Sequence, residues 1–232
     1  SDYSSVSHTF TSVGNYTVTL TADNGICMET SFDDDICIEP ALTPAFTLDI
    51  NNGCSPLETQ TTNTTDLTES CGGETYLWEV AYTSEFCGTG PAQWNFRGGT
   101  DENSAAPSFS FITAGIYTLT LSTINSRGTD STSVTIEVKQ PPTATIESLV
   151  NSCGSATINP IANIDTCAPS SETISYSWSF PGGTPATANT LNPGTVTYAT
   201  PGSYQVSFSV TNNCGTTIDT EDFEVNPIPT IT

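Results

Sequence analysis

Apolar and polar residues alternate strictly in three short segments of the chain, and each segment begins with the same arrangement of residues. An aromatic residue is followed by a glycine, then by a tyrosine, and then by apolar residues at every second position. The copies are Phe10, Gly14, Tyr16, Val18 and Leu20; Phe111, Gly115, Tyr117, Leu119 and Leu121; and Tyr198, Gly202, Tyr204, Val206 and Phe208. A period of two predicts a strand with one buried face, and the glycine predicts a turn from a preceding strand.

The spacing of the copies predicts the size of a repeated unit. They lie about 90 to 100 residues apart, which is the length of a seven-stranded sandwich of the immunoglobulin class. A repeat this regular indicates an array of one small unit, because a single catalytic domain does not repeat itself. The tyrosine matches the tyrosine corner of such sandwiches, and an ordinary core aromatic at this position leads to the same fold. We therefore predict an all-β protein of tandem immunoglobulin-like antiparallel sandwiches.

Proline residues mark the boundaries between units. Each copy ends in an apolar strand that leads to Pro40, Pro141 or Pro227, after which a new strand pattern begins. Short proline-rich joints favour a stiff, extended array. The predicted segments are 1–43, the C-terminal part of an incomplete sandwich; 44–142, a sandwich with an insertion; 143–226, a sandwich; and 227–232, the start of a following repeat. Both ends are thus expected to lie inside a longer array.

The chain is strongly acidic, with 25 acidic and 3 basic residues and a net charge of -22. This charge repels nucleic acids and anionic lipid surfaces, so we expect neither as a partner. Two interpretations of the acidity are open. It keeps strand edges from pairing and the protein in solution. Alternatively, carboxylates near the first joint bind a hard cation such as calcium, and the candidate ligands are Asp33, Asp34, Asp35 and Glu39.

Eight cysteines without any Cys-x-x-Cys spacing, and with a single histidine in the chain, indicate disulfides formed in an oxidising compartment. Cys214 follows a predicted hairpin turn beside the loop that holds Cys167, so we expect these two to pair. Cys71 and Cys87 are the near pair in the middle unit, where closing a loop of about 15 residues stabilises by roughly 3 kcal/mol. Bridges are thus expected inside units, and the partner of Cys27 in the missing front half of the first unit.

The middle unit carries an aromatic-rich insertion between Cys71 and Trp94. Two tryptophans compete for one core position, so one of them, together with Tyr82 and Phe86, is surplus to the core in one interpretation. Exposed aromatic rings on a rigid β scaffold stack on sugar rings, which makes Trp78, Tyr82 and Phe86 candidate glycan-binding residues. In the other interpretation, the insertion forms an extra edge strand whose aromatic side chains pack.

Catalytic motifs are missing from the sequence. There is no Gly-x-Ser-x-Gly, His-Glu-x-x-His or phosphate-loop pattern. Carboxylate pairs can perform glycosidase chemistry, but here they are scattered over the turns of small sandwiches that have no room for a deep cleft. We predict that the chain is not an enzyme and has no catalytic residue.

The chain resembles the PKD domain family of immunoglobulin-like sandwiches. The shared pattern is a strand with tryptophan, a glycine-rich turn and the aromatic, glycine and tyrosine phrase. The residues His8-Thr9-Phe10 match the start of the family's phrase, whereas Trp94–Gly99 and Trp178–Gly183 lack the acidic residues of its turn. The excess of cysteine, threonine and asparagine is similar to PKD-type repeats in surface adhesins of gliding Bacteroidota, which type 9 secretion exports. Asp130-Ser131-Thr132 resembles the O-glycosylation sequon of these bacteria, so Ser131 is a candidate acceptor.

This resemblance implies a non-catalytic repeat segment of a long, extracellular, cell-surface adhesin or filament. Such a segment extends the protein from the bacterial surface and supports adhesion or gliding. Its partners would be neighbouring repeats of the same chain, and surface glycans or other cell-surface proteins. The alternative is an accessory glycan- or protein-binding PKD module of a secreted polysaccharide- or protein-degrading enzyme. The number of repeats in the parent chain distinguishes the two.

Overall fold

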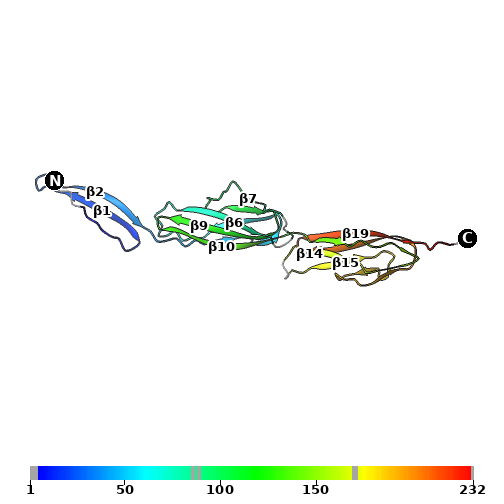
Figure 1. Ribbon diagram of the computed structural model, residues 1–232. Coiled ribbons are helices and arrows are strands. Elements are labelled where there is room, and N and C mark those ends of the chain that lie inside the picture. The colour runs from blue at the N-terminus through cyan, green and yellow to red at the C-terminus, as the bar shows by residue number, and fades with distance from the viewer. Residues whose placement is uncertain (1–4, 85–86, 88–89, 169–171, 231–232) are drawn as a thin grey trace.

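The computed structural model describes residues 5–84, 87, 90–168 and 172–230, and every regular element in these ranges is a β-strand. The strands form three successive units, a hairpin and two sandwiches, which follow one another in a row with the two termini at opposite ends (Figure 1). The predicted fold class, tandem immunoglobulin-like antiparallel sandwiches in an extended array, is confirmed.

The first unit is a single antiparallel hairpin of β1 (Gly14–Ala22) and β2 (Thr30–Ile38). No other described strand joins this sheet. As a result, Val18 and Leu20, which the alternation places on one face, are 43% and 69% exposed. Their counterparts in the other two units are fully buried. The hairpin therefore has the pattern of a sandwich strand pair without the second layer that would cover it.

The second unit is a sandwich of two four-stranded sheets, with the orders β4-β10-β9-β6 and β3-β5-β8-β7. Strand β4 runs parallel to β10, and the other neighbours are antiparallel. The inner faces of the two sheets bury an aromatic-rich core around Trp78, Phe109 and Tyr117. The bounds are β3 (Phe46–Leu48), β4 (Asn52–Cys54), β5 (Leu57–Asn63), β6 (Thr75–Thr83), β7 (Trp94–Arg97), β8 (Ser108–Phe111), β9 (Gly115–Asn125) and β10 (Gly128–Lys139).

The third unit repeats this arrangement. Its main sheet has the order β12-β19-β18-β15-β16, and the pairs β11-β14 and β13-β17 complete it. Strand β12 runs parallel to β19, as β4 does to β10. The core centres on Trp178, Phe208 and Tyr198, all fully buried. The bounds are β11 (Thr143–Ile146), β12 (Ser152–Cys153), β13 (Ala156–Ile158), β14 (Ala162–Asp165), β15 (Ser175–Ser179), β16 (Thr187–Ala188), β17 (Val196–Tyr198), β18 (Gly202–Asn212) and β19 (Gly215–Asn226).

The strand register makes positions in the three units directly comparable. The repeated hairpin begins at a glycine that pairs with an apolar residue of the last strand: Gly14 with Ile38, Gly115 with Val138, and Gly202 with Val225. In every unit, an asparagine stands 10 residues after this glycine, where the turn of the hairpin begins. We call these residues, Asn24, Asn125 and Asn212, the turn asparagines.

A tyrosine corner fixes the start of each hairpin. The hydroxyl donates to the carbonyl oxygen of a residue just before the strand: Tyr16 to Ser12 at 3.0 Å, Tyr117 to Thr113 at 2.8 Å, and Tyr204 to Thr200 at 2.7 Å. Gly115 has a φ of 144°, and a Cβ atom there would lie 2.6 Å from the ring of Tyr82. Gly115 thus provides a backbone conformation that favours glycine and the space for the ring of Tyr82 beside the corner.

Two tyrosines of the third unit give a matched test of this corner. Tyr204→Phe removes the hydrogen bond to Thr200, so we expect the free energy of unfolding to fall by about 1 kcal/mol. Tyr198→Phe removes a buried hydroxyl that has no hydrogen-bond partner among the described residues, and Phe111 holds the same place in the second unit. We expect this change to cost nothing. Chemical denaturation of both variants measures the difference, and an equal loss in the two would contradict the assignment.

Candidate functional site at the joints between units

All three disulfides in the described part of the chain connect different units. They join Cys37 to Cys71, Cys54 to Cys214, and Cys87 to Cys167, with Cα–Cα distances of 5.8, 5.4 and 5.0 Å. Cys27 and Cys153 are free and exposed. The first joint, between the hairpin unit and the second unit, thus has one bridge, and the second joint, between the second and third units, has two.

The predicted pairings Cys167–Cys214 and Cys71–Cys87 are wrong, although all four cysteines do form disulfides. The reason is their position at the ends of elongated sandwiches. Cys214 lies in the β18–β19 turn and Cys167 in the loop after β14, and both reach the second unit. Each therefore meets a cysteine of the neighbouring unit, because turns and loops at the end of a sandwich are where the next unit in a row is placed.

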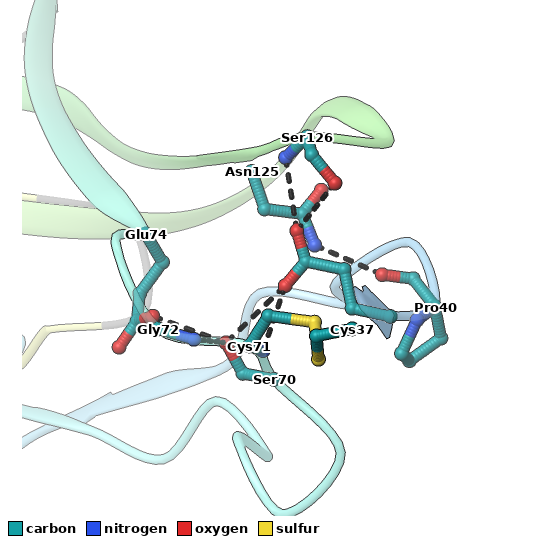
Figure 2. Close-up of a disulfide and its surroundings, with 9 residues drawn as sticks. Cys37, Pro40, Ser70, Cys71, Gly72, Glu74, Asn125 and Ser126 are labelled. Carbon is teal, nitrogen blue, oxygen red and sulfur yellow. Dashed lines mark hydrogen bonds between the residues drawn. A yellow bond between two sulfur atoms is a disulfide. The ribbon is translucent and has the colours of Figure 1, made fainter. Parts of the chain in front are cut away.

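Glu39 organises the first joint. This residue directly follows β2, and its carboxylate is buried against the second unit. One oxygen, Oε1, accepts hydrogen bonds from the Ser126 hydroxyl at 2.6 Å and the Ser126 N–H at 3.0 Å, and Oε2 accepts one from the Cys71 N–H at 2.9 Å. These donors, the Ser126 hydroxyl foremost, lower the pKa of Glu39. Figure 2 shows the Cys37–Cys71 disulfide in this setting.

Lys139 stands at the second joint where Glu39 stands at the first. Each directly follows the residue that pairs with the glycine of the repeated phrase. Its Nζ lies 3.1 Å from Oε2 of Glu172 in the third unit, and the two side chains are only 13% and 3% exposed. The other oxygen, Oε1 of Glu172, accepts the Asn213 N–H at 2.9 Å. The buried carboxylate therefore has both a cation and a backbone donor, which offset the cost of taking it out of water.

The turn asparagines form the same contact at both joints. Asn125 Nδ2 donates to the carbonyl oxygen of Pro40 at 2.9 Å, and Asn212 Nδ2 donates to that of Gln140 at 2.8 Å. Figure 2 shows the Asn125 contact. The Oδ1 atoms meanwhile accept an N–H of their own turns, at 3.0 and 2.8 Å. One side chain thus holds the hairpin turn and the end of the preceding unit together.

The candidate calcium ligands do not converge. Asp33 and Asp35 lie on one face of β2, where they accept hydrogen bonds from the Thr19 and Thr17 hydroxyls at 2.7 and 2.8 Å. Asp34 points to the opposite face because side chains alternate along a strand, and Glu39 is directed into the second unit. In the described ranges, the one group of acidic, thiol or imidazole side chains close enough to share an ion contains Cys87, Asp165 and Cys167. Its two sulfur atoms are joined in a disulfide.

The hypothesis of surplus, exposed aromatic residues is wrong for Trp78 and Tyr82. Trp78 is 2% exposed, and its Nε1 donates to the Ser104 carbonyl oxygen at 2.9 Å. It pairs with Leu121 of β9, as Trp178 pairs with Phe208 of β18, so β6 is the counterpart of β15 and not an insertion. Tyr82 is partly buried, with its hydroxyl bonded to the Ala114 carbonyl oxygen.

The remaining predicted site residues have different outcomes. Phe86 lies outside the described residues. Trp94 lies in β7 of the opposite sheet, partly buried against Phe96 and Phe109. Ser131 is exposed on β10, with its N–H bonded to the Asp130 carboxylate at 2.8 Å. Its glycosylation stays a prediction.

Residues 152–225, nearly the whole third unit, match the PKD domain family. This match supports the resemblance seen in the sequence and indicates PKD-type immunoglobulin-like repeats, a class of non-catalytic module. No curated protein matches the chain. Among the described residues, no helix is long and apolar enough to cross a membrane.

Several solved structures with domains in a row are similar to the chain. A titin fragment, I67–I69 in an E-to-A variant, is 13% identical with a TM-score of 0.48, over 94% of this chain and 75% of that one. Extracellular domains 3–5 of Drosophila OTK are 14% identical with a TM-score of 0.34, over 94% and 72% of the two chains. Cadherin domains 1–5 of protocadherin gamma B2 are 10% identical with a TM-score of 0.38, over 94% and 46%.

Glu39 makes the first joint sensitive to acid. Its pKa in the folded protein is lower than in the unfolded chain, so its stabilisation is fully present above the ordinary glutamate value of about 4.3 and is lost as the pH falls through the lowered pKa. We expect the amide resonances of Ser126 and Cys71 to titrate with a midpoint below that value. Glu39→Gln should abolish the transition, whereas Glu69→Gln, which changes an exposed carboxylate nearby, should preserve it. A midpoint at or above the ordinary value would refute this role.

The buried Lys139–Glu172 ion pair leads to a prediction about the stability of the third unit. Lys139→Met leaves the Glu172 carboxylate buried without its cation, so we expect the third unit to lose roughly 3 kcal/mol of stability. Combining it with Glu172→Gln removes the buried charge and keeps an acceptor for Asn213, and should recover most of the loss. Denaturation curves of the single and double variants provide the measurement. A single variant as stable as the parent protein would show that the pair contributes nothing.

Proposed function

We propose that this chain is a stiff, non-catalytic segment of an extracellular surface filament or adhesin. The observation that carries the proposal is that all three disulfides of the described chain cross between units. Disulfides persist in oxidising, extracellular compartments, and here they hold the units to one another, whereas their usual role in a small domain is to stabilise its interior. A row of locked units serves to span distance and to bear load.

The second joint explains the proposed stiffness. A single bridge between two bodies leaves rotation about the connecting bonds, whereas two bridges at separate points oppose it. Cys54–Cys214 and Cys87–Cys167 start from different places on the second unit, at the end of β4 and in the loop after β6. The Lys139–Glu172 pair and the Asn212 contact lie in the same joint. Bending there would strain covalent bonds and expose a buried charge.

The bridges also give tension a short covalent path through the array. Residues Cys54 and Cys214 are separated by 160 positions in the sequence and are directly bonded. A pull on the two ends of the chain passes through this bond, so the chain between the two cysteines cannot be drawn out. The cores of both sandwiches lie almost wholly within that stretch. A segment built this way would resist extension under the shear forces met at a cell surface.

The finer parts of the proposal rest on the sequence. We propose that residues 44–142 and 143–226 are successive repeats of one array, and that the parent protein resembles the adhesins of gliding Bacteroidota that type 9 secretion exports. Its ligands are surface glycans or other cell-surface proteins, contacted through faces other than the buried Trp78. The net charge of -22 keeps such an array from associating edge to edge.

Single-molecule extension tests the proposed mechanical role. The oxidised chain, pulled from its ends, should extend much less than the reduced chain. Breaking the bridges releases the 160-position stretch between Cys54 and Cys214, or about 500 Å of additional length at about 3.3 Å per residue. Replacing both Cys54 and Cys87 by serine should release most of this length without reductant, whereas Cys27→Ser should not. Equal extension of the oxidised and reduced chains would overturn the load-bearing role.

A further inference from the structure

A cleft of about 350 Å³ opens in the side of the second unit, between the edges of its two sheets. Thr61 and Asn63 of β5 line it from one sheet, and Tyr76 of β6 lines it from the other. Ala105 and Ala106, in the loop between β7 and β8, close it on a third side. Binding sites for small molecules begin at about 300 Å³, so the cleft has the size for a ligand at the small end of that range.

The loop that closes the cleft is fixed to both sheets. On the β6 side, Nε1 of the buried Trp78 donates to the carbonyl oxygen of Ser104 at 2.9 Å. On the β5 side, the Thr61 hydroxyl and the Thr61 N–H donate to the carbonyl oxygen of Pro107 at 2.7 and 3.1 Å. The cleft is therefore preformed, and binding there does not require the loop to become ordered first.

The cleft is neutral but polar. None of the described residues that line it is charged, although the chain has a net charge of -22. An ion would lose water there without gaining a partner of opposite charge. Asn63 Oδ1 accepts the Thr65 N–H at 3.0 Å, which leaves Nδ2 as a donor without a partner among the described residues. Burial and the charge of Glu74 raise the pKa of Tyr76, so its hydroxyl keeps its proton. These groups suit a neutral ligand that carries hydroxyl groups.

Thr123 adds a polar group that the fold does not use. It pairs with Tyr76 in register, so both side chains point into the sandwich. Thr123 is 1% exposed, and its hydroxyl has no hydrogen-bond partner in the described part of the chain. In the third unit, the tyrosine two residues before the core tryptophan, Tyr176, faces the fully buried Val210 instead. A buried hydroxyl without a partner is explained where a bound molecule or water reaches it.

An extended peptide does not suit this site, because the strand edges beside it are already paired. The Trp78 N–H donates to the carbonyl oxygen of Glu102 at 2.8 Å, and the Thr61 N–H to that of Pro107. A peptide that adds a strand to a sheet needs such groups free. A sugar ring needs none of them, because its C–H face packs on an aromatic ring and its hydroxyls bond to side chains.

We propose that this cleft binds a sugar residue of a neutral glycan. The pyranose ring lies against Tyr76, with Leu67 and Ala106 as further apolar contacts, and Asn63 Nδ2 donates to one of its hydroxyl groups. The inference rests on the proposed adhesin role for its purpose, and it adds the place of binding and the neutral class of glycan to that role.

The test is a titration of the oxidised chain followed by its amide resonances. The neutral probes are cellobiose, maltose, mannobiose and chitobiose, and glucuronic acid is the anionic probe. We expect at least one neutral disaccharide to shift the amides of Asn63, Thr65 and Ala106 in a saturable way, with a dissociation constant on the order of 1 mM. Glucuronic acid should bind at least about tenfold more weakly, because the cleft offers its carboxylate no cation.

Two variants locate the binding. Ala106→Trp fills the cleft from an exposed position and keeps the carbonyl oxygen that accepts Gln60 Nε2 at 3.1 Å, so affinity should fall about tenfold or more. Asn63→Asp keeps the Oδ1 acceptor for Thr65 and removes the Nδ2 donor, which should also cost about tenfold. The matched control is Ala186→Trp, an exposed alanine of the third unit whose carbonyl oxygen also accepts a hydrogen bond. It should leave affinity unchanged.

The proposal is overturned if none of the neutral probes gives a saturable shift at these amides. It is equally overturned if Ala106→Trp binds as tightly as the parent chain, or if glucuronic acid binds as well as the disaccharides. The extension experiment does not involve the cleft. A chain that resists extension but binds no sugar therefore keeps the load-bearing role and loses only this site.

Discussion

A long hairpin with a capped turn is the constraint on which the rest of the structure depends. At one end of the hairpin, the tyrosine corner fixes where the first strand begins. In the second and third units, the inner face of the hairpin supplies the middle of the hydrophobic core. At the other end the turn asparagine holds the turn and contacts the preceding unit. Because β9 and β18 are both 11 residues long, packing inside a unit determines how far the turn lies from the corner, and so where the joint with the preceding unit is placed.

The sequence predicted the hairpins well because their signal is local. Alternation over a few residues and a glycine before tyrosine report directly on strand and turn conformation. The core role of Trp78 was not predictable from spacing, because Trp78 lies 39 residues before Tyr117 whereas Trp178 lies 26 before Tyr204, and Trp94, at 23, is the closer match. The misleading feature was the second tryptophan, Trp94, whose glycine-rich surroundings resemble those of Trp178 although its strand belongs to the other sheet.

The disulfide pairings could not be predicted from the sequence in the same way. A bridge between units depends on how two folded bodies face each other, and that is decided by the turn asparagines, Glu39 and Lys139 acting together. One signal was present: Cys54 and Cys153 both lie shortly after the start of a unit, and Cys214 lies at a turn tip. The acidic run at Asp33–Asp35 was misleading for a simpler reason, since consecutive residues of a strand face opposite ways.

The bridges make the order of the units a chemical property of the chain. The turn position that holds Cys214 in the third unit holds Arg127 in the second. A unit with arginine there cannot take the place of one with cysteine, and the first joint uses a different pair, Cys37 with Cys71. In the folded chain each bridge joins two neighbouring units, with Cα–Cα distances of 5.8, 5.4 and 5.0 Å, and this short distance requires the two units to lie end to end in this order. The set of bonded cysteines therefore identifies which unit is the neighbour of which, so a map of the disulfides is also a map of the order of the units.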